Sequence, residues 1–276
     1  MPSPVPSVPP QPPVPSVPSV PPVRSSVVAA LRAAGCVFAE DEAELIFTAA
    51  RTASEITAMV DRRVAGEPLE IVVGRAEFHG LLITVEPGVF VPRRRTEFLV
   101  DQALALTPDA GLVVDLCCGS GAVGVALAAS PAAPRLHAAD IDPVAVRCAR
   151  RNLAPYEGHV HEGDLYAALP DALRGRIDVL TANVPYVPSD EVRLLPAEAR
   201  EHEPPAALDG GTDGLDLLRR VAAGAPRWLA PGGALLVETS ERQAPAALAA
   251  FTGAGLDARL AHEEEYGTTV VIGLRR

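Results

Sequence analysis

Short aliphatic runs alternate with helical patterns along most of the chain beyond residue 111. Runs of this kind, joined by longer stretches with helical spacing, predict buried strands connected by crossover helices. The expected strands are L-V-V-D-L (112–116), R-L-H-A-A-D (135–140), H-V-H-E-G-D (159–164), 176–182, A-L-L-V-E (234–238) and T-V-V-I-G-L (269–274). The expected helices are 121–130, 143–152, 213–225 and 241–253. This pattern predicts an α/β fold with a mostly parallel sheet, whose ligands bind beyond the carboxyl ends of the strands.

The N-terminal part of the chain follows other patterns. Residues 1–24 are rich in proline, so we expect a disordered tail with partial polyproline II structure. Helical patterns from Ser25 to Gly35, at 41–50 and at 54–65 predict a small helical domain over 25–68. This domain would either help dock a substrate or simply cap the larger domain. Within 69–88, E-I-V-V-G (70–74) and G-L-L-I-T-V (80–85) predict a linking hairpin, and a helix is expected at 97–106.

Composition narrows the class of protein. The chain has 276 residues, 48% of them hydrophobic, and a formal charge of −11, which argues against a long nucleic-acid groove. Its four cysteines form no CxxC pair and lie at no zinc-ligand spacing, so free thiols and no metal site are expected. No apolar run approaches the ~18 residues of a membrane span, and the N-terminus lacks a signal-peptide pattern. These features predict a cytoplasmic protein that does not bind membranes.

A glycine-rich loop follows the first of the expected parallel strands. D-L-C-C-G-S-G-A-V-G (115–124) matches GxGxxG, and Asp140 ends the next strand, so a nicotinamide cofactor fits this pattern. Asp115 favours S-adenosylmethionine instead, because an acid before the glycines suits the cationic methionine amino group better than a pyrophosphate. Asp140 suits the ribose diol of either cofactor, and Asp164 and Leu165 would flank the adenine.

The stretch T-A-N-V-P-Y (181–186) lies at the end of another expected strand, beside the glycine loop. An amide or exocyclic amine attacks poorly because its lone pair is delocalised. The side-chain oxygen of Asn183 and a nearby backbone carbonyl could accept both hydrogens of such a nitrogen and aim its lone pair at a methyl group. Pro185 would hold that carbonyl in place, and Tyr186 offers a face for a flat group. This stretch is therefore the predicted substrate site.

Beyond this chemistry, the chain resembles the HemK-type protein-glutamine methyltransferases, which modify the glutamine of the Gly-Gly-Gln loop in peptide-chain release factors. The resemblance runs from about residue 27 to the C-terminus. It rests on R-R-V-A-G-E-P-L (62–69), V-F-V-P-R-R-R-T-E (89–97), D-L-C-C-G-S-G (115–121), N-V-P-Y (183–186), H-E-P-P-A-A-L-D-G-G-T-D-G-L (202–215) and E-Y-G (265–267).

The resemblance implies a Rossmann-like S-adenosylmethionine-dependent methyltransferase domain over 89–276 with an antiparallel last strand, acting as a monomer on a release factor. The implied cofactor residues are Asp115, Cys117, Cys118, Gly119, Ser120, Gly121, Asp140, Ile141, Asp164, Leu165 and Asn183. The implied substrate residues are Asn183, Val184, Pro185, Tyr186, Arg93 and Glu97, with Thr96 also at the cleft mouth. Asn183, Pro185 and Tyr186 are the implied catalytic residues.

Three departures from the family pattern leave other functions open. Val184 stands where the family usually has a proline, Cys117-Cys118 replace a Gly-Thr type pair, and the helical region looks shorter than usual. Adenine-modifying enzymes share the Asn/Asp-Pro-Pro-Tyr loop, so methylation of a flipped nucleic-acid base is an alternative. Methylation of a small metabolite, a nicotinamide reductase and a non-enzymatic binding protein are the others.

Overall fold

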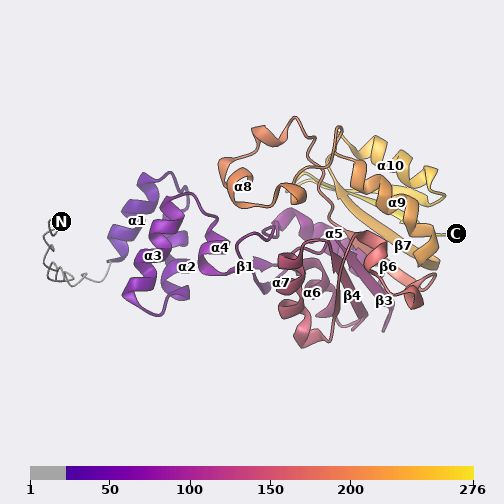
Figure 1. The fold of residues 1–276 in the computed structure, drawn as a ribbon, viewed down its shortest axis with the longest axis horizontal. Coiled ribbons are helices and arrows are strands. Elements are labelled where there is room, and N and C mark those ends of the chain that lie inside the picture. Colours follow the sequence, from indigo (N-terminus) through magenta and orange to yellow (C-terminus); the bar gives the residue numbers. More distant parts are fainter. Residues whose placement is uncertain (1–22) are drawn as a thin grey trace, which may run out of the picture. The chain divides into compact units, whose positions relative to one another are not determined.

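A computed structural model describes residues 23–276 (Figure 1). The described chain divides into two compact units, one ending at Asp61 and the other beginning at Arg62. The predicted tail, residues 1–24, lies outside the described residues except for Val23 and Arg24.

The first unit is built from the three predicted helices. They are α1 (Arg24–Ala33), α2 (Ala39–Ala49) and α3 (Ala53–Val64), the last of which continues into the second unit. Helices α1 and α2 bury Leu31 and Ile46 completely. The existence of these helices is confirmed, and their docking role stays a prediction.

The predicted strand at 70–74 is wrong, because this stretch forms the short helix α4 (Leu69–Val73). Its β-branched residues favour a strand locally, but Ile71 and Val72 are buried in this helix and Gly74 ends it in the left-handed conformation. The expected hairpin begins later, with β1 (Arg75–Phe78) paired antiparallel to β2 (Leu81–Thr84).

The main sheet of the second unit has the order β5-β4-β3-β6-β7-β9-β8. Its strands are β3 (Leu112–Leu116), β4 (Arg135–Asp140), β5 (His159–Glu162), β6 (Ile177–Ala182), β7 (Leu229–Thr239), β8 (Asp257–Glu263) and β9 (Thr268–Leu274). Strands β3 to β7 are parallel, and β9 runs antiparallel between β7 and β8. The mostly parallel sheet with an antiparallel last strand is therefore confirmed. Only β8 was not predicted, since it is a polar strand at the sheet edge.

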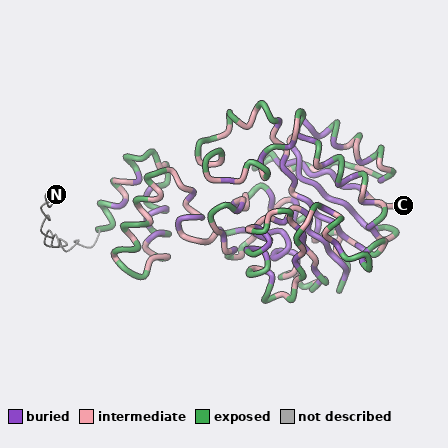
Figure 2. The backbone as a smooth tube through the Cα atoms, in the orientation of Figure 1, coloured by how far each residue is buried: buried purple, intermediate pink, exposed green. Residues whose placement is uncertain are grey.

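Helices cover both faces of this sheet (Figure 1). On one face lie α5 (Glu97–Leu104), α6 (Ala122–Ala128) and α7 (Pro143–Leu153), and on the other α9 (Asp216–Trp228) and α10 (Ala244–Gly253). Strand β3 contributes side chains to the core on both faces of the sheet. Val114 packs with the α9 and α10 side chains, and Val113 packs with those of α5 to α7. Figure 2 shows the resulting buried strands in the middle of this unit.

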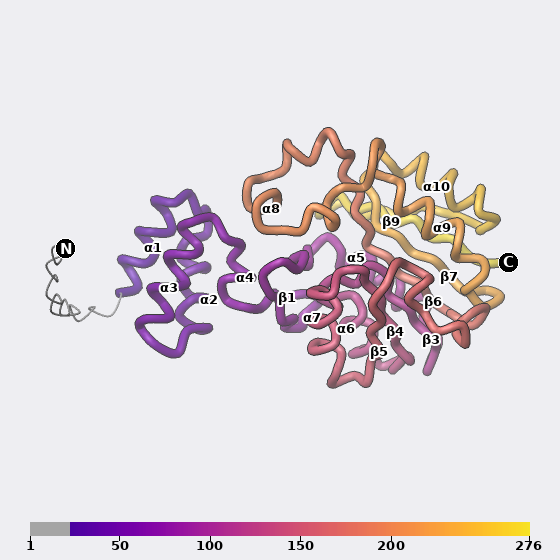
Figure 3. The backbone as a smooth tube through the Cα atoms, in the orientation of Figure 1, coloured from indigo at the N-terminus to yellow at the C-terminus, as the bar shows by residue number. Residues whose placement is uncertain are grey.

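Between β6 and α9 the chain makes a long excursion, residues 183–215, that contains α8 (Ala197–His202) and is visible as the orange tube in Figure 3. Val187 pairs with Asp209, so the excursion closes on itself beside the end of β6. Short 3-10 helices are Arg94–Thr96, Ala154–Tyr156, Leu165–Ala168, Asp171–Leu173, Val192–Leu194 and Pro205–Ala207. Within residues 23–276, no helix combines the length and the apolar character needed to cross a bilayer.

Candidate active site

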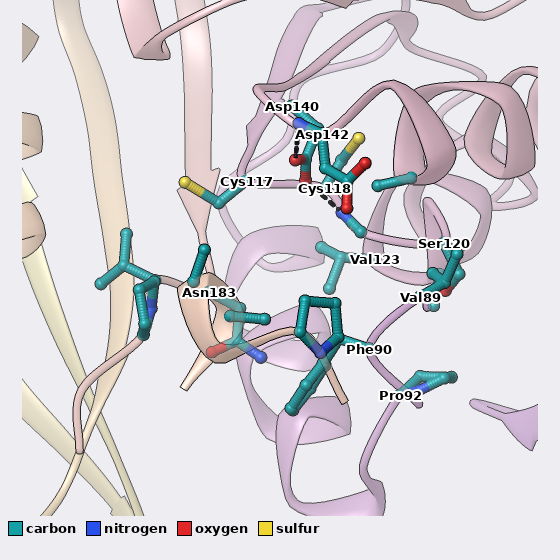
Figure 4. A pocket seen from close by; sticks show the side chains of 18 of the residues that line it. Val89, Phe90, Pro92, Cys117, Cys118, Ser120, Val123, Asp140, Asp142 and Asn183 are labelled. Carbon is teal, nitrogen blue, oxygen red and sulfur yellow. Dashed lines mark hydrogen bonds between the residues drawn. The ribbon is translucent and has the colours of Figure 1, made fainter. Parts of the chain in front are cut away.

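A pocket lies at the carboxyl ends of β3, β4 and β6 (Figure 4). Strand β3 is flanked by β4 on one side and β6 on the other, which is the switch point where ligands bind in sheets of this kind. The predicted site residues that line the pocket are Asp115, Cys117, Cys118, Gly119, Ser120, Asp140, Ile141, Asn183, Val184, Pro185 and Tyr186, together with Thr96. The structure thus brings the glycine loop and the Asn183 stretch into one cavity, while the role of each residue stays a prediction.

The glycine loop turns sharply between β3 and α6. The Gly121 N–H donates to the Cys118 carbonyl over 2.7 Å, and Gly121 caps α6 with a φ of +80°. A Cβ on Gly119 would meet no protein atom within 4 Å, so the loop leaves open space on that side. Cys117 adopts a φ of +54°, which is unusual for a residue other than glycine.

Neither cysteine of the loop has the character of a nucleophile. Burial raises the pKa of both thiols, and the nearby carboxylates of Asp115 and Asp140 raise it further. None of the four cysteines, all within the described residues, forms a disulfide, as the sequence predicted. The pair therefore forms part of the pocket wall as neutral thiols.

Asp115 is a nearly fully buried carboxyl at the end of β3. Its oxygens accept hydrogen bonds from the Thr181 hydroxyl (2.9 Å) and the Gly124 N–H (3.2 Å). Burial nevertheless raises the pKa of Asp115 to about 7, and the charge of Asp140 adds to the rise. A cation in the pocket would stabilise the ionised form, which fits the predicted binding of a methionine amino group.

Asp140 ends β4 and closes the same side of the pocket (Figure 4). Its oxygens accept from the Gly119 N–H (2.8 Å) and the Asp142 N–H (3.0 Å), which ties the glycine loop to the neighbouring strand. Next to it, Ile141 leaves 64% of its surface exposed while lining the pocket. A diol beside Asp140 and a flat apolar ring against Ile141 would fit this geometry.

Asn183 follows β6 and faces the pocket from the side opposite Asp140 (Figure 4). Its side-chain nitrogen donates to the hydroxyl oxygen of Thr96 over 3.3 Å. With Nδ2 engaged in this bond, Oδ1 is the atom left to accept a hydrogen bond from a substrate. Among the described residues, no backbone hydrogen bond occupies the carbonyl of Val184 either. The stretch thus offers acceptors, as an amide or amine nitrogen requires.

The glycines of the motif at 208–214 support this stretch from behind. A Cβ on Gly210 would come within 2.6 Å of the Pro185 carbonyl oxygen. A Cβ on Gly214 would come within 2.2 Å of the Tyr186 carbonyl oxygen. The Gln243 amide also donates to the Tyr186 carbonyl over 2.9 Å. Only glycine permits so close an approach, which explains why a motif distant in sequence accompanies N-V-P-Y.

Five predicted residues do not line the pocket. Gly121 caps α6 as described, and Glu97 accepts from the His79 N–H over 3.0 Å. Arg93 pairs with the buried Glu203, Asp164 pairs with Arg220 over 2.6 Å, and Leu165 is buried in the core. None of the five lines this pocket, and their contact with a ligand stays a prediction.

Several lining residues were missed by the sequence reasoning. They are mainly apolar or loop residues, including Val89, Phe90, Pro92, Arg95, Asp142, Pro204 and Leu208. Arg95 lies with its guanidinium 5.4 Å from the Tyr186 ring centroid. The V-F-V-P-R-R-R-T-E block already pointed to residues 89–97, so the signal was present in the sequence, but it did not say which arginine faces the pocket.

Comparison with known proteins agrees with this geometry. Residues 80–199 match the family model described as Methyltransferase small domain. The chain is 38% identical to the release factor glutamine methyltransferase of Geobacter sulfurreducens, over 79% of this chain and 76% of the relative. The chain belongs to the release factor glutamine methyltransferase family. Further relatives from other bacteria carry the same name, so the resemblance inferred from the sequence is confirmed.

Two other similarities add detail to this family assignment. A 4-amino-L-phenylalanine/4-methylamino-L-phenylalanine methyltransferase from Streptomyces pristinaespiralis is 38% identical over 71% of this chain and 70% of the relative. The crystal structure of a methyltransferase from Pyrococcus furiosus superposes with a TM-score of 0.55 at 15% identity, covering 71% of this chain and 89% of that one. The second similarity supports the methyltransferase fold alone.

Release factor glutamine methyltransferases use S-adenosylmethionine, and the residues of this pocket fit that cofactor. The buried Asp115 suits its amino group, the open side of the loop at Gly119 leaves room for its chain, and Asp140 with Ile141 suits its nucleoside. Bound there, the cofactor would supply an electrophilic methyl group on a sulfonium. The nicotinamide alternative is thereby set aside.

Proposed function

We propose that this protein transfers a methyl group from S-adenosylmethionine to the side-chain amide nitrogen of a glutamine in a peptide-chain release factor. Family membership carries the proposal, because relatives named for this activity are similar over most of their length. The presence of Asn183 in the same cavity as the glycine loop supports it. The reaction is expected in the cytoplasm, where release factors act.

The proposed role of the Asn183 stretch is to orient the acceptor nitrogen. Asn183 Oδ1 would accept one amide hydrogen, and the carbonyl of Val184 would accept the other. These bonds favour a partly pyramidal nitrogen, and the flat acceptor group would pack against Tyr186. No strong base is needed before transfer, since the nitrogen loses its proton to solvent afterwards. Positioning of this kind contributes several kcal/mol when reacting atoms are held ~3–3.5 Å apart.

The proposal is tested by incubating the protein with cofactor and unmethylated release factors, then mapping methylated peptides by mass spectrometry. We expect one added methyl group on the glutamine of the Gly-Gly-Gln loop. The matched control is Asn183→Ala, which should reduce turnover at least ~100-fold while affecting cofactor affinity less. Absence of glutamine methylation by the wild type, or full turnover by the variant, would contradict the proposal.

A second candidate substrate is a small aromatic amine. The relative named for 4-amino-L-phenylalanine supports it, because an aromatic amine has the same delocalised lone pair as an amide. The acceptor side of the pocket includes Phe90, Pro185 and Tyr186, which would suit an aromatic ring. Running the same assay with 4-aminophenylalanine in place of the release factor separates the two candidates. The monomeric state of the protein and the absence of stable nucleic-acid binding stay predictions.

A further inference from the structure

Gln243 is a buried amide side chain just outside the candidate active site. It lies in the turn between β7 and α10, with 6% of its surface exposed, and it does not line the pocket. Its Nε2 donates to the Tyr186 carbonyl over 2.9 Å and to the Asp213 carbonyl over 2.8 Å. Both protons of this side-chain amide are therefore engaged by carbonyls from opposite ends of the excursion after β6.

The Ser240 hydroxyl determines which end of the Gln243 amide meets these carbonyls. It donates to Gln243 Oε1 over 2.6 Å, so the amide oxygen points back into the turn. The Gln243 backbone N–H also donates to the Ser240 carbonyl over 3.0 Å, which holds the two residues together. An exchange of the amide oxygen and nitrogen would place the oxygen against two carbonyl oxygens. The three side-chain bonds therefore select one orientation of the amide.

The space that this amide occupies depends on the glycine at position 214. A Cβ on Gly214 would come within 2.3 Å of Gln243 Nε2 as well as close to the Tyr186 carbonyl oxygen. Gly214 also has a φ of +75°, in the left-handed region that favours glycine. The contact between the Gln243 amide and Tyr186 is thus built with a glycine from the far end of the excursion.

Tyr186 is held at its other end as well. Its hydroxyl donates to Oε1 of Glu238, a residue near the end of β7, over 3.3 Å. The Arg95 guanidinium lies 5.4 Å from the centroid of the Tyr186 ring. Because the carbonyl and the hydroxyl of Tyr186 are both bonded to the segment 238–243, this residue of the pocket wall is held in one place.

We propose that Gln243 is a positioning residue for methyl transfer, which fixes the Tyr186 carbonyl and with it the stretch that orients the acceptor nitrogen. Pro185 fixes one backbone angle of this stretch, and the bond to Gln243 fixes the peptide group that follows Tyr186. A small displacement of the stretch would misalign the acceptor nitrogen and lower kcat. The inference rests on the proposed function, in which Val184 and Tyr186 contact the acceptor.

Two substitutions of Gln243 separate a hydrogen-bonding role from packing. Gln243→Met keeps the length of the side chain without a donor, and Gln243→Glu replaces the donor nitrogen by an oxygen. As a carboxylate, the new side chain would repel the two carbonyl oxygens that it faces, whereas its protonated form has one O–H to donate. Burial and these carbonyls should raise its pKa, so it gains the proton as the pH falls.

The test measures kcat of both variants relative to the wild type between pH 5.5 and 9, with saturating cofactor and whichever acceptor the wild type methylates. At pH 9, kcat should be about 10- to 100-fold lower in both variants, the scale on which misplaced reacting groups act. Toward pH 5.5, the relative kcat of Gln243→Glu should rise at least ~threefold while that of Gln243→Met stays constant. Affinity for S-adenosylhomocysteine should change less than ~threefold, since Gln243 does not line the pocket. Wild-type kcat in both variants, or equal losses in both at every pH, would overturn the inference.

A second readout needs no acceptor. The chain has four tyrosines, so labelling their carbonyl carbons with ¹³C gives few NMR signals, and the signal lost in Tyr186→Phe belongs to Tyr186. This signal should shift in Gln243→Met, because the carbonyl loses its side-chain donor. An unchanged signal overturns the inference whether or not an acceptor is methylated. A shifted signal, together with a wild type that methylates neither release factor nor aromatic amine, contradicts only the proposed function.

Discussion

At the scale of single residues, Cys117 occupies a backbone conformation that suits glycine. Its φ of +54° lies in the left-handed region, which costs a residue with a Cβ roughly 1–2 kcal/mol. The chain therefore carries this strain in the glycine loop of its pocket.

This strain predicts that glycine at position 117 gives a more stable protein than alanine, which is the reverse of the usual order. Cys117→Gly and Cys117→Ala both remove the sulfur, but only glycine relieves the left-handed backbone. We expect the Gly variant to have the higher free energy of unfolding, by about 1 kcal/mol, whereas alanine is usually the more stabilising of the two within regular structure. Urea denaturation followed by the fluorescence of Trp228, the single tryptophan, measures the difference. An alanine variant as stable as the glycine variant would contradict the argument.

Asp115 predicts a pH dependence of cofactor affinity. Burial raises its pKa to about 7, above the ordinary value, so in the free protein the carboxyl is protonated below about pH 7. Binding of the cationic amino group favours the carboxylate and must then release this proton. The affinity for S-adenosylhomocysteine should therefore fall by up to ~10-fold per pH unit below 7 and level off above it.

Calorimetric titrations between pH 5.5 and 8 measure this profile, and Asp115→Asn is the control. The variant should bind more weakly at pH 8 and lose the slope. If the slope persists in the variant, another group titrates in its place, and Asp140 is then the nearest candidate because burial raises its pKa as well.

The sequence predicted the residues of the site unequally well, for a physical reason. Asp115 lies near the end of a buried strand and Asn183 directly follows another. Because strand ends in a parallel sheet converge, their placement could be inferred from the pattern alone. Arg93 and Asp164 were expected at the ligand, yet they pair with Glu203 and Arg220. Those partners are distant in sequence, and no local pattern indicates which charges will meet.

At the scale of elements, the sequence predicted buried segments better than edges. Strands β3 and β4 have the predicted bounds because they are short aliphatic runs. Segment 70–74 is a helix despite its β-branched residues, since tertiary burial decides the conformation of so short a run. Strand β8 has no alternation of apolar residues, and its pairing with β9 alone makes it a strand.

The Arg93–Glu203 pair connects two elements of the pocket wall, the segment before α5 and the excursion after β6. The Glu203 side chain is 1% exposed, and burial raises its pKa while the Arg93 charge opposes the rise. Arg93→Met leaves a buried carboxylate without its cation, so we expect a loss of about 2 kcal/mol in the free energy of unfolding at pH 8.

The loss of unfolding free energy caused by Arg93→Met should be smaller at pH 5 than at pH 8. Without Arg93, the pKa of Glu203 in the folded protein rises further above its unfolded value. The cost of the buried charge then develops as the pH rises from the unfolded pKa of Glu203 to its folded pKa, and protonation relieves it in acid. The neighbouring Arg94→Met is a matched control, since Arg94 is exposed and should change stability by less than ~0.5 kcal/mol. A penalty that is equal at both pH values would contradict a buried charge as its cause.

At the scale of the whole molecule, the residues that line the pocket all lie in the unit that begins at Arg62. No described residue of the helical unit lines the pocket, and its docking role stays a prediction. Its most exposed large apolar side chains are Val37 and Phe38, with 82% and 69% of their surfaces accessible. Exposed neighbours of this kind often serve as anchors for a protein partner.

The docking role predicted for this unit is tested by comparing two acceptors of different size. In the double variant Val37→Ser and Phe38→Ser, kcat/KM for an intact release factor should fall about tenfold, the effect of losing one modest interface anchor. For a short Gly-Gly-Gln peptide, which reaches only the pocket, kcat/KM should not change. Leu82→Ser removes a similarly exposed side chain from the other unit and should leave both acceptors unaffected. If the double variant loses activity equally with the protein and the peptide, the helical unit acts on the pocket rather than on the partner. If it loses activity with neither, docking depends on other surfaces.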